Sequence, residues 1–65
     1  MKQFYAFVSI AQVVVRMRTK DQRPATQFDC NAGVNSAADL FEATGFTTTP
    51  EERVAAHAEL MRRMS

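Results

Sequence analysis

The sequence predicts an α+β domain in which an antiparallel β-hairpin is followed by two helices. Residues 3–18 are rich in β-branched and aromatic side chains and contain no Gly, Pro, Asn or Asp, which is typical of a strand. A polar connection and a second, shorter apolar segment follow, as in a hairpin. Residues 36–44 and 50–64 then carry the residues that cap helices.

The chain has 65 residues, which we interpret as a single small domain over residues 1–65. A chain of this length buries only about 60% of its unfolded surface, so its core is thin. Cys30 is the only cysteine, which excludes an internal disulfide, and Cys30 with His57 is too small a ligand set for structural zinc. We expect no metal and no cofactor, and we expect a partner to supply additional burial.

The first predicted strand covers residues 3–18. Its large apolar residues alternate on even numbers up to Ile10 and on odd numbers from Val13 onward. The change of parity near Gln12 predicts a β-bulge, because one inserted residue keeps the apolar side chains on one face. Two abutting strands would produce the same pattern, but no turn residue separates them. We therefore interpret this segment as one long bulged strand.

The second predicted strand covers residues 25–31, after a polar connection over 19–24. The register that places the apolar groups of both strands on one face pairs Val15 with Phe28. On the opposite face, Arg16 and Asp29 then become diagonal neighbours of opposite charge.

Residues 3–11 of the first strand have no partner nearby in the sequence, and Phe4–Ala11 carries no charge. Such an edge is a template for pairing with another chain. It would form a homodimer through the first strand, or it would add to the sheet of another protein. A fold-back of the second strand, or a central position beneath the helices, would also bury it, and these alternatives stay open.

The first predicted helix covers residues 36–44, after a turn at 32–35. Ser36 is spaced from Asp39 as in a capping box. At the other end, Gly45 supplies a left-handed residue, and Phe46 is placed to pack back on the helix as in a Schellman motif. The expected buried stripe consists of Ala37, Leu40, Phe41 and Thr44.

The second predicted helix covers residues 50–64 and has the strongest local signal. Thr49 is a preferred N-cap residue, Pro50 suits the first helical position, and Glu52 completes a capping box. Its expected buried stripe consists of Val54, His57, Ala58, Met61 and Met64.

The residue set does not favour catalysis. Cys30 and His57 are the one possible pair of nucleophile and base, and no third group is placed to orient the imidazole. We interpret both as packed residues, because each lies on an apolar face of its predicted element. Glu51 and Glu52 are interpreted as helix-start residues rather than as a catalytic carboxylate pair.

The net charge of +1 is distributed unevenly. Residues 1–24 hold five basic residues against one acidic residue, whereas residues 25–49 hold three acidic residues and no basic one. Two candidate partner-binding surfaces follow. The basic hairpin tip consists of Arg16, Arg18, Lys20 and Arg23. The acidic face consists of Asp29, Asp39, Glu42, Glu51 and Glu52.

Two C-terminal helices also fit a small DNA-binding regulator of the helix-turn-helix or ribbon-helix-helix class. Glu51 and Glu52 would then approach the phosphates first, which disfavours nucleic acid as the partner. This regulator is kept as an alternative, together with a structural phage subunit that dimerises through the first strand.

The most apolar segment, Phe4–Val15, is too short to cross a bilayer, because a span takes about 20 residues. A signal peptide ending near Ala11 would also be shorter than the usual range. We expect no membrane association, and we expect a cytoplasmic protein with a reduced Cys30.

In size and organisation the chain resembles the small proteins that phages and mobile elements encode to block host machinery, such as anti-CRISPR proteins. The shared features are the short chain, the composition rich in Ala, Val and Arg, and the lack of a catalytic set. The resemblance covers layout alone and transfers no residues. It implies a non-enzymatic inhibitor that binds a protein target stoichiometrically in a bacterial cytoplasm. A Cas subunit of a CRISPR-Cas effector is one such target, and its basic groove would accept the acidic face.

Overall fold

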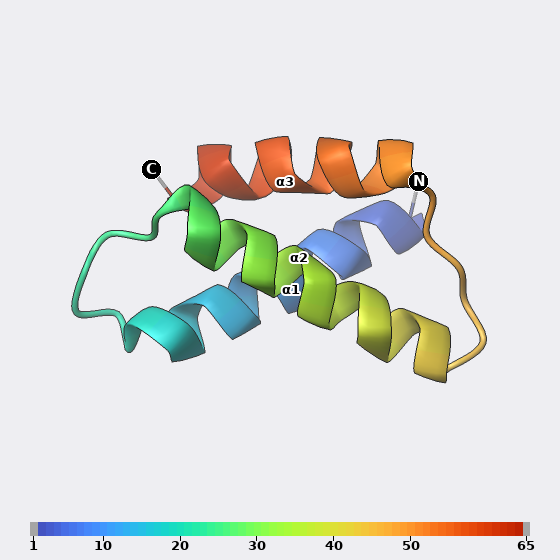
Figure 1. Ribbon diagram of the computed structural model, residues 1–65, viewed down its shortest axis with the longest axis horizontal. Coiled ribbons are helices and arrows are strands. Elements are labelled where there is room, and N and C mark those ends of the chain that lie inside the picture. Colours follow the sequence, from blue (N-terminus) through green and yellow to red (C-terminus); the bar gives the residue numbers. More distant parts are fainter. Residues whose placement is uncertain (1, 65) are drawn as a thin grey trace.

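Three helices make up the computed structural model, which describes residues 2–64 (Figure 1). They are α1 (Lys2–Thr19), α2 (Gln27–Ala43) and α3 (Pro50–Met64). No strand occurs in this part of the chain. The protein is therefore an all-α three-helix bundle, and the predicted α+β class with its β-hairpin is wrong.

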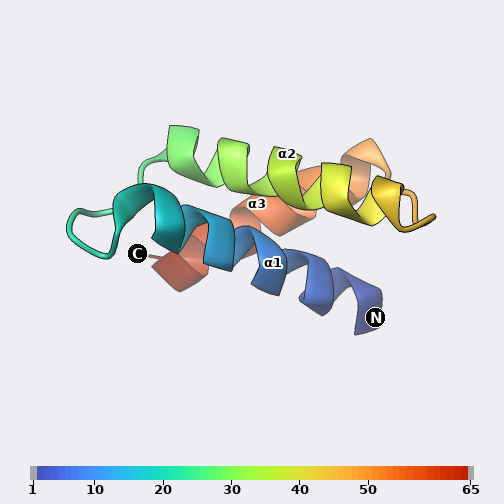
Figure 2. The ribbon, with the colours of Figure 1, turned by 90° about the horizontal axis from the view of Figure 1, so that it is seen from below.

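The bundle is elongated, with extents of 33 × 19 × 18 Å. The loop between α1 and α2 lies at the same end of the long axis as the end of α3 (Figure 1). The loop between α2 and α3 lies at the opposite end, with the starts of α1 and α3. Figure 2 shows α1 and α2 next to each other, with α3 behind them.

The segment predicted as the first strand, residues 3–18, is helix α1. Its buried hydrophobic residues and Phe4, which packs on the core, follow a helical spacing: Phe4, Phe7, Val8, Ala11 and Val15. This spacing matches one face of a helix, and no β-bulge is present at Gln12. Ile10 packs at the edge of this face. A β-branched residue in a helix costs only a few tenths of a kcal/mol, so burial of this face outweighs the strand-like composition.

The segment predicted as the second strand and the following turn, residues 25–35, forms most of the N-terminal half of α2. The helix begins after Thr26, whose hydroxyl oxygen accepts a hydrogen bond from the Asp29 amide at 3.3 Å. The Asp29 carboxylate accepts one from the Thr26 amide at 2.9 Å, which completes a capping box. Ser36 therefore lies inside the helix, and the predicted start at residue 36 is wrong.

Gly33 lies in the middle of α2, at its crossing with α1. A Cβ atom at this position would lie 2.7 Å from Val15 Cγ2 and 2.8 Å from the Ala11 carbonyl oxygen. Only glycine lets the two helix backbones approach this closely, and this packing offsets the low helix propensity of glycine. The residue that was assigned to a turn is thus a packing residue.

The predicted end of the helix over residues 36–44 is confirmed, as the end of α2. Gly45 has a φ of 93°, and its amide donates to the Glu42 carbonyl oxygen at 3.1 Å. The Phe46 amide donates to the Phe41 carbonyl oxygen at 2.9 Å, and the two phenyl rings lie 5.7 Å apart. These are the hydrogen bonds and the apolar contact of a Schellman motif.

The predicted helix over residues 50–64 is also confirmed, as α3. The Glu52 amide donates to the Thr49 hydroxyl oxygen at 3.1 Å, and the Glu52 carboxylate accepts from the Thr49 amide at 2.9 Å. This capping box forms at the residues that the sequence indicated.

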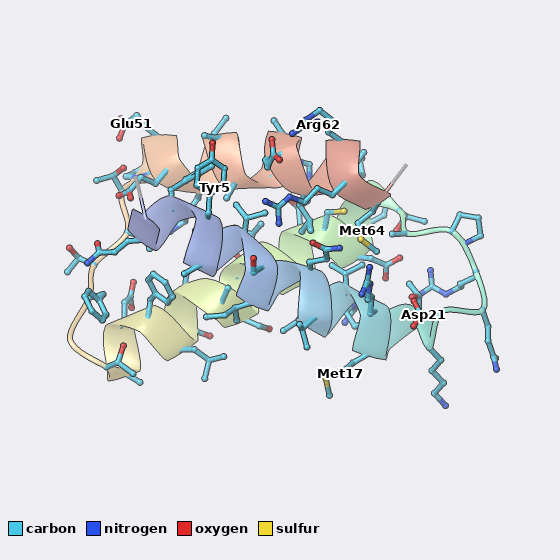
Figure 3. The ribbon with its side chains drawn as sticks, turned by 180° about the vertical axis from the view of Figure 1, so that it is seen from behind. Tyr5, Met17, Asp21, Glu51, Arg62 and Met64 are labelled. Carbon is cyan, nitrogen blue, oxygen red and sulfur yellow. The ribbon has the colours of Figure 1, made fainter. Side chains whose placement is uncertain are left out.

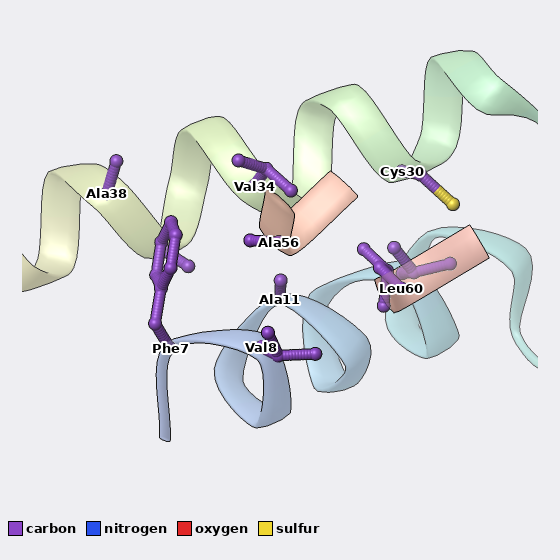
Figure 4. Packing of buried hydrophobic residues seen from close by; sticks show 10 residues of the cluster. Phe7, Val8, Ala11, Cys30, Val34, Ala38, Ala56 and Leu60 are labelled. Atoms are coloured by element: carbon purple, nitrogen blue, oxygen red, sulfur yellow. The ribbon is translucent and has the colours of Figure 1, made fainter. Parts of the chain in front are cut away.

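The buried stripes of α2 and α3 match the predicted ones only in part: Ala37 is buried, and Phe41 and Met64 pack on the core. In α3 the buried residues are Ala56 and Leu60, whereas Val54 is 72% exposed. In α2, Leu40 is exposed because the longer helix turns a different face inward. The core combines all three helices, and its largest fully buried side chains are Phe7, Leu60, Val8, Val15 and Cys30 (Figure 4).

Candidate interaction surfaces

The four residues of the predicted basic hairpin tip do lie together, but on a helix end and a loop. Arg16 and Arg18 belong to the last turn of α1, and Lys20 and Arg23 belong to the loop before α2. We call this surface the basic end. It lies at the end of the long axis that also holds the last turn of α3 (Figure 1).

Asp29 belongs to the basic end rather than to an acidic face. Its carboxylate accepts two hydrogen bonds from the Arg23 guanidinium, at 2.7 and 3.1 Å, and one from Arg18 Nε at 3.3 Å. The side chain is almost fully buried. These bonds, chiefly those from Arg23, together with the Thr26 amide, hold the pKa of Asp29 well below its usual range. The carboxylate is therefore charged and fully engaged within the fold.

The Asp29 network leaves two of the four predicted basic residues available. Arg18 and Arg23 are engaged by Asp29, while Arg16 and Lys20 are exposed and form no ion pair within residues 2–64. Nearby in α3, the Glu59 carboxylate accepts hydrogen bonds from Arg62 at 3.2 Å and from Arg63 at 3.1 Å. The six basic residues at this end of the molecule thus face three carboxylates, those of Asp21, Asp29 and Glu59, and a net positive charge remains.

The other four residues of the predicted acidic face lie at the opposite end of the molecule, which we call the acidic end: Asp39, Glu42, Glu51 and Glu52. Glu42 pairs with Arg53 at 3.4 Å, and Glu52 is held in the capping box of α3. Glu51 is exposed at the start of α3, far from Asp21 in the loop of the basic end (Figure 3). The predicted acidic face is therefore divided between the two ends.

A groove of about 240 Å³ lies between α2 and α3. It is lined by Asn31, Val34, Asn35, Arg53, Val54 and His57. A second, more apolar hollow adjoins it on α3 and is lined by Pro50, Glu51, Val54 and Ala55. Val54 contributes to both, so an exposed isopropyl group lies at the centre of a surface that we call the Val54 surface.

Sequence reasoning missed most of the Val54 surface. It assigned Val54 to the core, and it placed Asn31 and Asn35 in a strand and a turn. The capping box of Thr26 and Asp29 was the signal that would have placed both asparagines on one face of a helix, four residues apart.

Cys30 and His57 have separate environments. Cys30 points into the core, and its burial raises the pKa of the thiol (Figure 4). The His57 ring lines the groove, with Nε2 3.4 Å from the Gln27 carbonyl oxygen. Within residues 2–64, no three His, Cys, Asp or Glu side chains gather as a metal site would require. None of the three helices, over the residues described, has the length and apolar character needed to cross a bilayer.

No protein-family model matches the sequence, and comparisons with curated proteins and with solved structures find no significant similarity.

Proposed function

We propose that the protein is a non-enzymatic inhibitor that acts by stoichiometric binding to a protein target, and that the Val54 surface is its contact surface. The observation that carries this proposal is the position of Val54, which is 72% exposed at the junction of two hollows. Concave apolar surface with a few polar groups around it is characteristic of binding sites.

The surroundings of Val54 define the chemistry of the target. Asn31 and Asn35 line the groove with amide groups, which can donate to and accept from a peptide backbone. Asp39 and Glu51 add negative charge at this end of the bundle, whereas Glu42 is paired with Arg53, which lines the groove. A target segment with an apolar side chain flanked by Lys or Arg is complementary to this arrangement.

The inhibitor part of the proposal rests on the same complementarity. A basic groove that normally holds nucleic acid has the charge that the acidic end attracts, and its occupation by this protein would exclude the nucleic acid. The proposed setting is a defence complex in a bacterial cytoplasm. The predicted hairpin layout is wrong, so the resemblance to anti-CRISPR proteins is one of chain size and composition.

A DNA-binding regulator is the weaker candidate. The ribbon-helix-helix form requires a strand, and residues 2–64 contain none. Two arginines of the basic end, Arg18 and Arg23, are engaged by Asp29, which reduces the charge available to phosphates.

The test is capture of the target from nuclease-treated bacterial lysate by three forms of the tagged protein: wild type, Val54→Glu and Val13→Glu. Val13 is also exposed but lies on α1, so its variant is the matched control. We expect wild type and Val13→Glu to retain one protein in a one-to-one ratio, and Val54→Glu to lose at least tenfold in affinity for it. Equal binding by Val54→Glu, or recovery of nucleic acid alone, would contradict the proposal.

A further inference from the structure

The outward face of α1 carries a row of apolar side chains, of which Ala6, Val13 and Met17 are exposed and Ile10 is partly buried and packs against the core. The row, which we call the α1 seam, consists of Ala6, Ile10, Val13 and Met17. Val13 is 56% exposed and Met17 is 71% exposed. Met17 projects away from the other two helices (Figure 3).

The spacing within the α1 seam indicates that its partner is another helix. Successive members are four, three and four residues apart, which is the repeat of a and d positions in a coiled coil. Such a narrow row is complementary to a second helix and is too narrow for the wider apolar face of a bundle core. The seam carries no charge, and Ala6 allows a close approach of another backbone.

We propose that the α1 seam is covered by the α1 seam of a second copy of this chain, with the two helices antiparallel. The α1 seam is separate from the Val54 surface, which lies between α2 and α3, although both proposals use the charge of the acidic end. The seam is self-complementary because it is apolar along its length, as the isologous contact of a two-fold dimer requires.

The charges at the two ends of the molecule select the antiparallel orientation. A parallel pair would place Arg16 and Lys20 beside the same residues of the second copy, which is repulsive. An antiparallel pair instead places each basic end beside the acidic end of the other copy, where four acidic residues (Asp39, Glu42, Glu51 and Glu52) outnumber the basic Lys2 and Arg53. The molecule is 33 Å long, so its two ends are separated by more than a Debye length, which is about 8 Å at physiological salt.

The short seam indicates a weak, concentration-dependent dimer. α1 is already ordered by the bundle, so pairing requires little further ordering of the backbone. One helix face of two heptads is at the small end of the range for specific interfaces, below about 1,200 Å² of total buried area. We expect a dissociation constant in the micromolar range.

Sedimentation equilibrium from about 1 µM to about 1 mM protein tests the dimer. Wild type is expected to pass from monomer to dimer, and Val13→Glu and Met17→Glu to weaken the dimer at least tenfold. Both sites are exposed, so the helical circular dichroism should be retained. Val54→Glu is the matched control and is expected to dimerise as wild type does. A monomer at all concentrations, or unchanged dimerisation of both α1 variants, would overturn the proposal.

A spin-label distance tests the orientation. The label is attached to Lys20→Cys in a Cys30→Ala background, at millimolar concentration. In the antiparallel dimer the two labels lie on opposite sides of the seam centre, about 25 Å apart from a rise of about 1.5 Å per residue. A separation below about 15 Å would indicate parallel helices and overturn the proposed arrangement, because paired helix axes lie only about 10 Å apart.

Discussion

Asp29 connects several elements of this small fold. Its carboxylate receives hydrogen bonds from Arg18 of α1, from Arg23 of the connecting loop and from Thr26 at the start of α2. One buried side chain thus joins two helices and the loop between them. A buried charge is stable only when it is paired and hydrogen-bonded, and here it is both.

This network predicts a loss of stability in acid. Because the pKa of Asp29 is lower in the folded protein than its ordinary value near 4, its stabilising contribution is fully present above that value. The contribution is lost as the pH falls toward the folded pKa. The urea midpoint, followed by circular dichroism between about pH 7 and about pH 2.5, should therefore decrease below about pH 4.

The Asp29→Asn variant should reduce both this acid slope and the stability at pH 7. Asp39→Asn is the matched control, because Asp39 is exposed and should leave the wild-type profile unchanged. Glu59 also has a lowered pKa, chiefly through its hydrogen bonds with Arg62, so part of the slope should remain. An Asp29→Asn protein with the full wild-type slope would show that the network contributes nothing to the acid response.

At the scale of the elements, the rotation of each helix about its axis decides which residues support the core. α3 was predicted to bury the face of Val54 and Met61, but it buries Ala56 and Leu60. The centres of the two faces lie about 120° apart on a helical wheel, and Met64, which packs on the core, lies between them. Contacts with α1 and α2 select the buried face and leave Val54 in the groove.

A pair of alanine variants separates the two faces. Leu60→Ala removes a fully buried side chain and should lower the free energy of unfolding by about 2–5 kcal/mol. Val54→Ala removes an exposed side chain and should change it by less than about 0.5 kcal/mol. Urea unfolding at pH 7 measures both changes in the free energy of unfolding. A larger loss of unfolding free energy for Val54→Ala than for Leu60→Ala would support the buried face that the sequence predicted.

At the scale of the whole molecule, the small core and the separation of charge between the two ends both favour binding of a partner. The chain has few large buried side chains, so a second copy would add useful apolar burial. Its basic and acidic ends lie at opposite ends of the long axis, which orients an approaching partner.

If the second copy binds through the α1 seam, thermal stability must depend on protein concentration. Binding that requires the folded state shifts the unfolding equilibrium by mass action. The melting temperature of wild type is therefore expected to rise as the concentration increases from about 10 µM to about 1 mM. Val13→Glu should show a melting temperature that stays constant over the same range. A constant value for wild type would contradict dimerisation at these concentrations.

Two helix ends could be predicted from the sequence because capping is local. Thr49 and Glu52 lie three residues apart, and Gly45 with Phe46 closes the preceding helix within one turn of chain. Hydrogen bonds between such near neighbours need few distant contacts, although Ser36 and Asp39, with the same spacing, lie inside α2 and form no cap. The sequence alone therefore determined where α2 ends and where α3 begins.

Only the tertiary structure decided that residues 3–18 are helical and that Asp29 belongs to the basic end. Local preferences for helix and strand in a segment rich in valine differ by tenths of a kcal/mol per residue, so burial against the other helices decides the outcome. Gly33 is a packing residue because Ala11 and Val15, far away in sequence, lie against it. Asp29 loses its place in an acidic face because Arg18, eleven residues earlier, reaches it only once α1 has folded against α2.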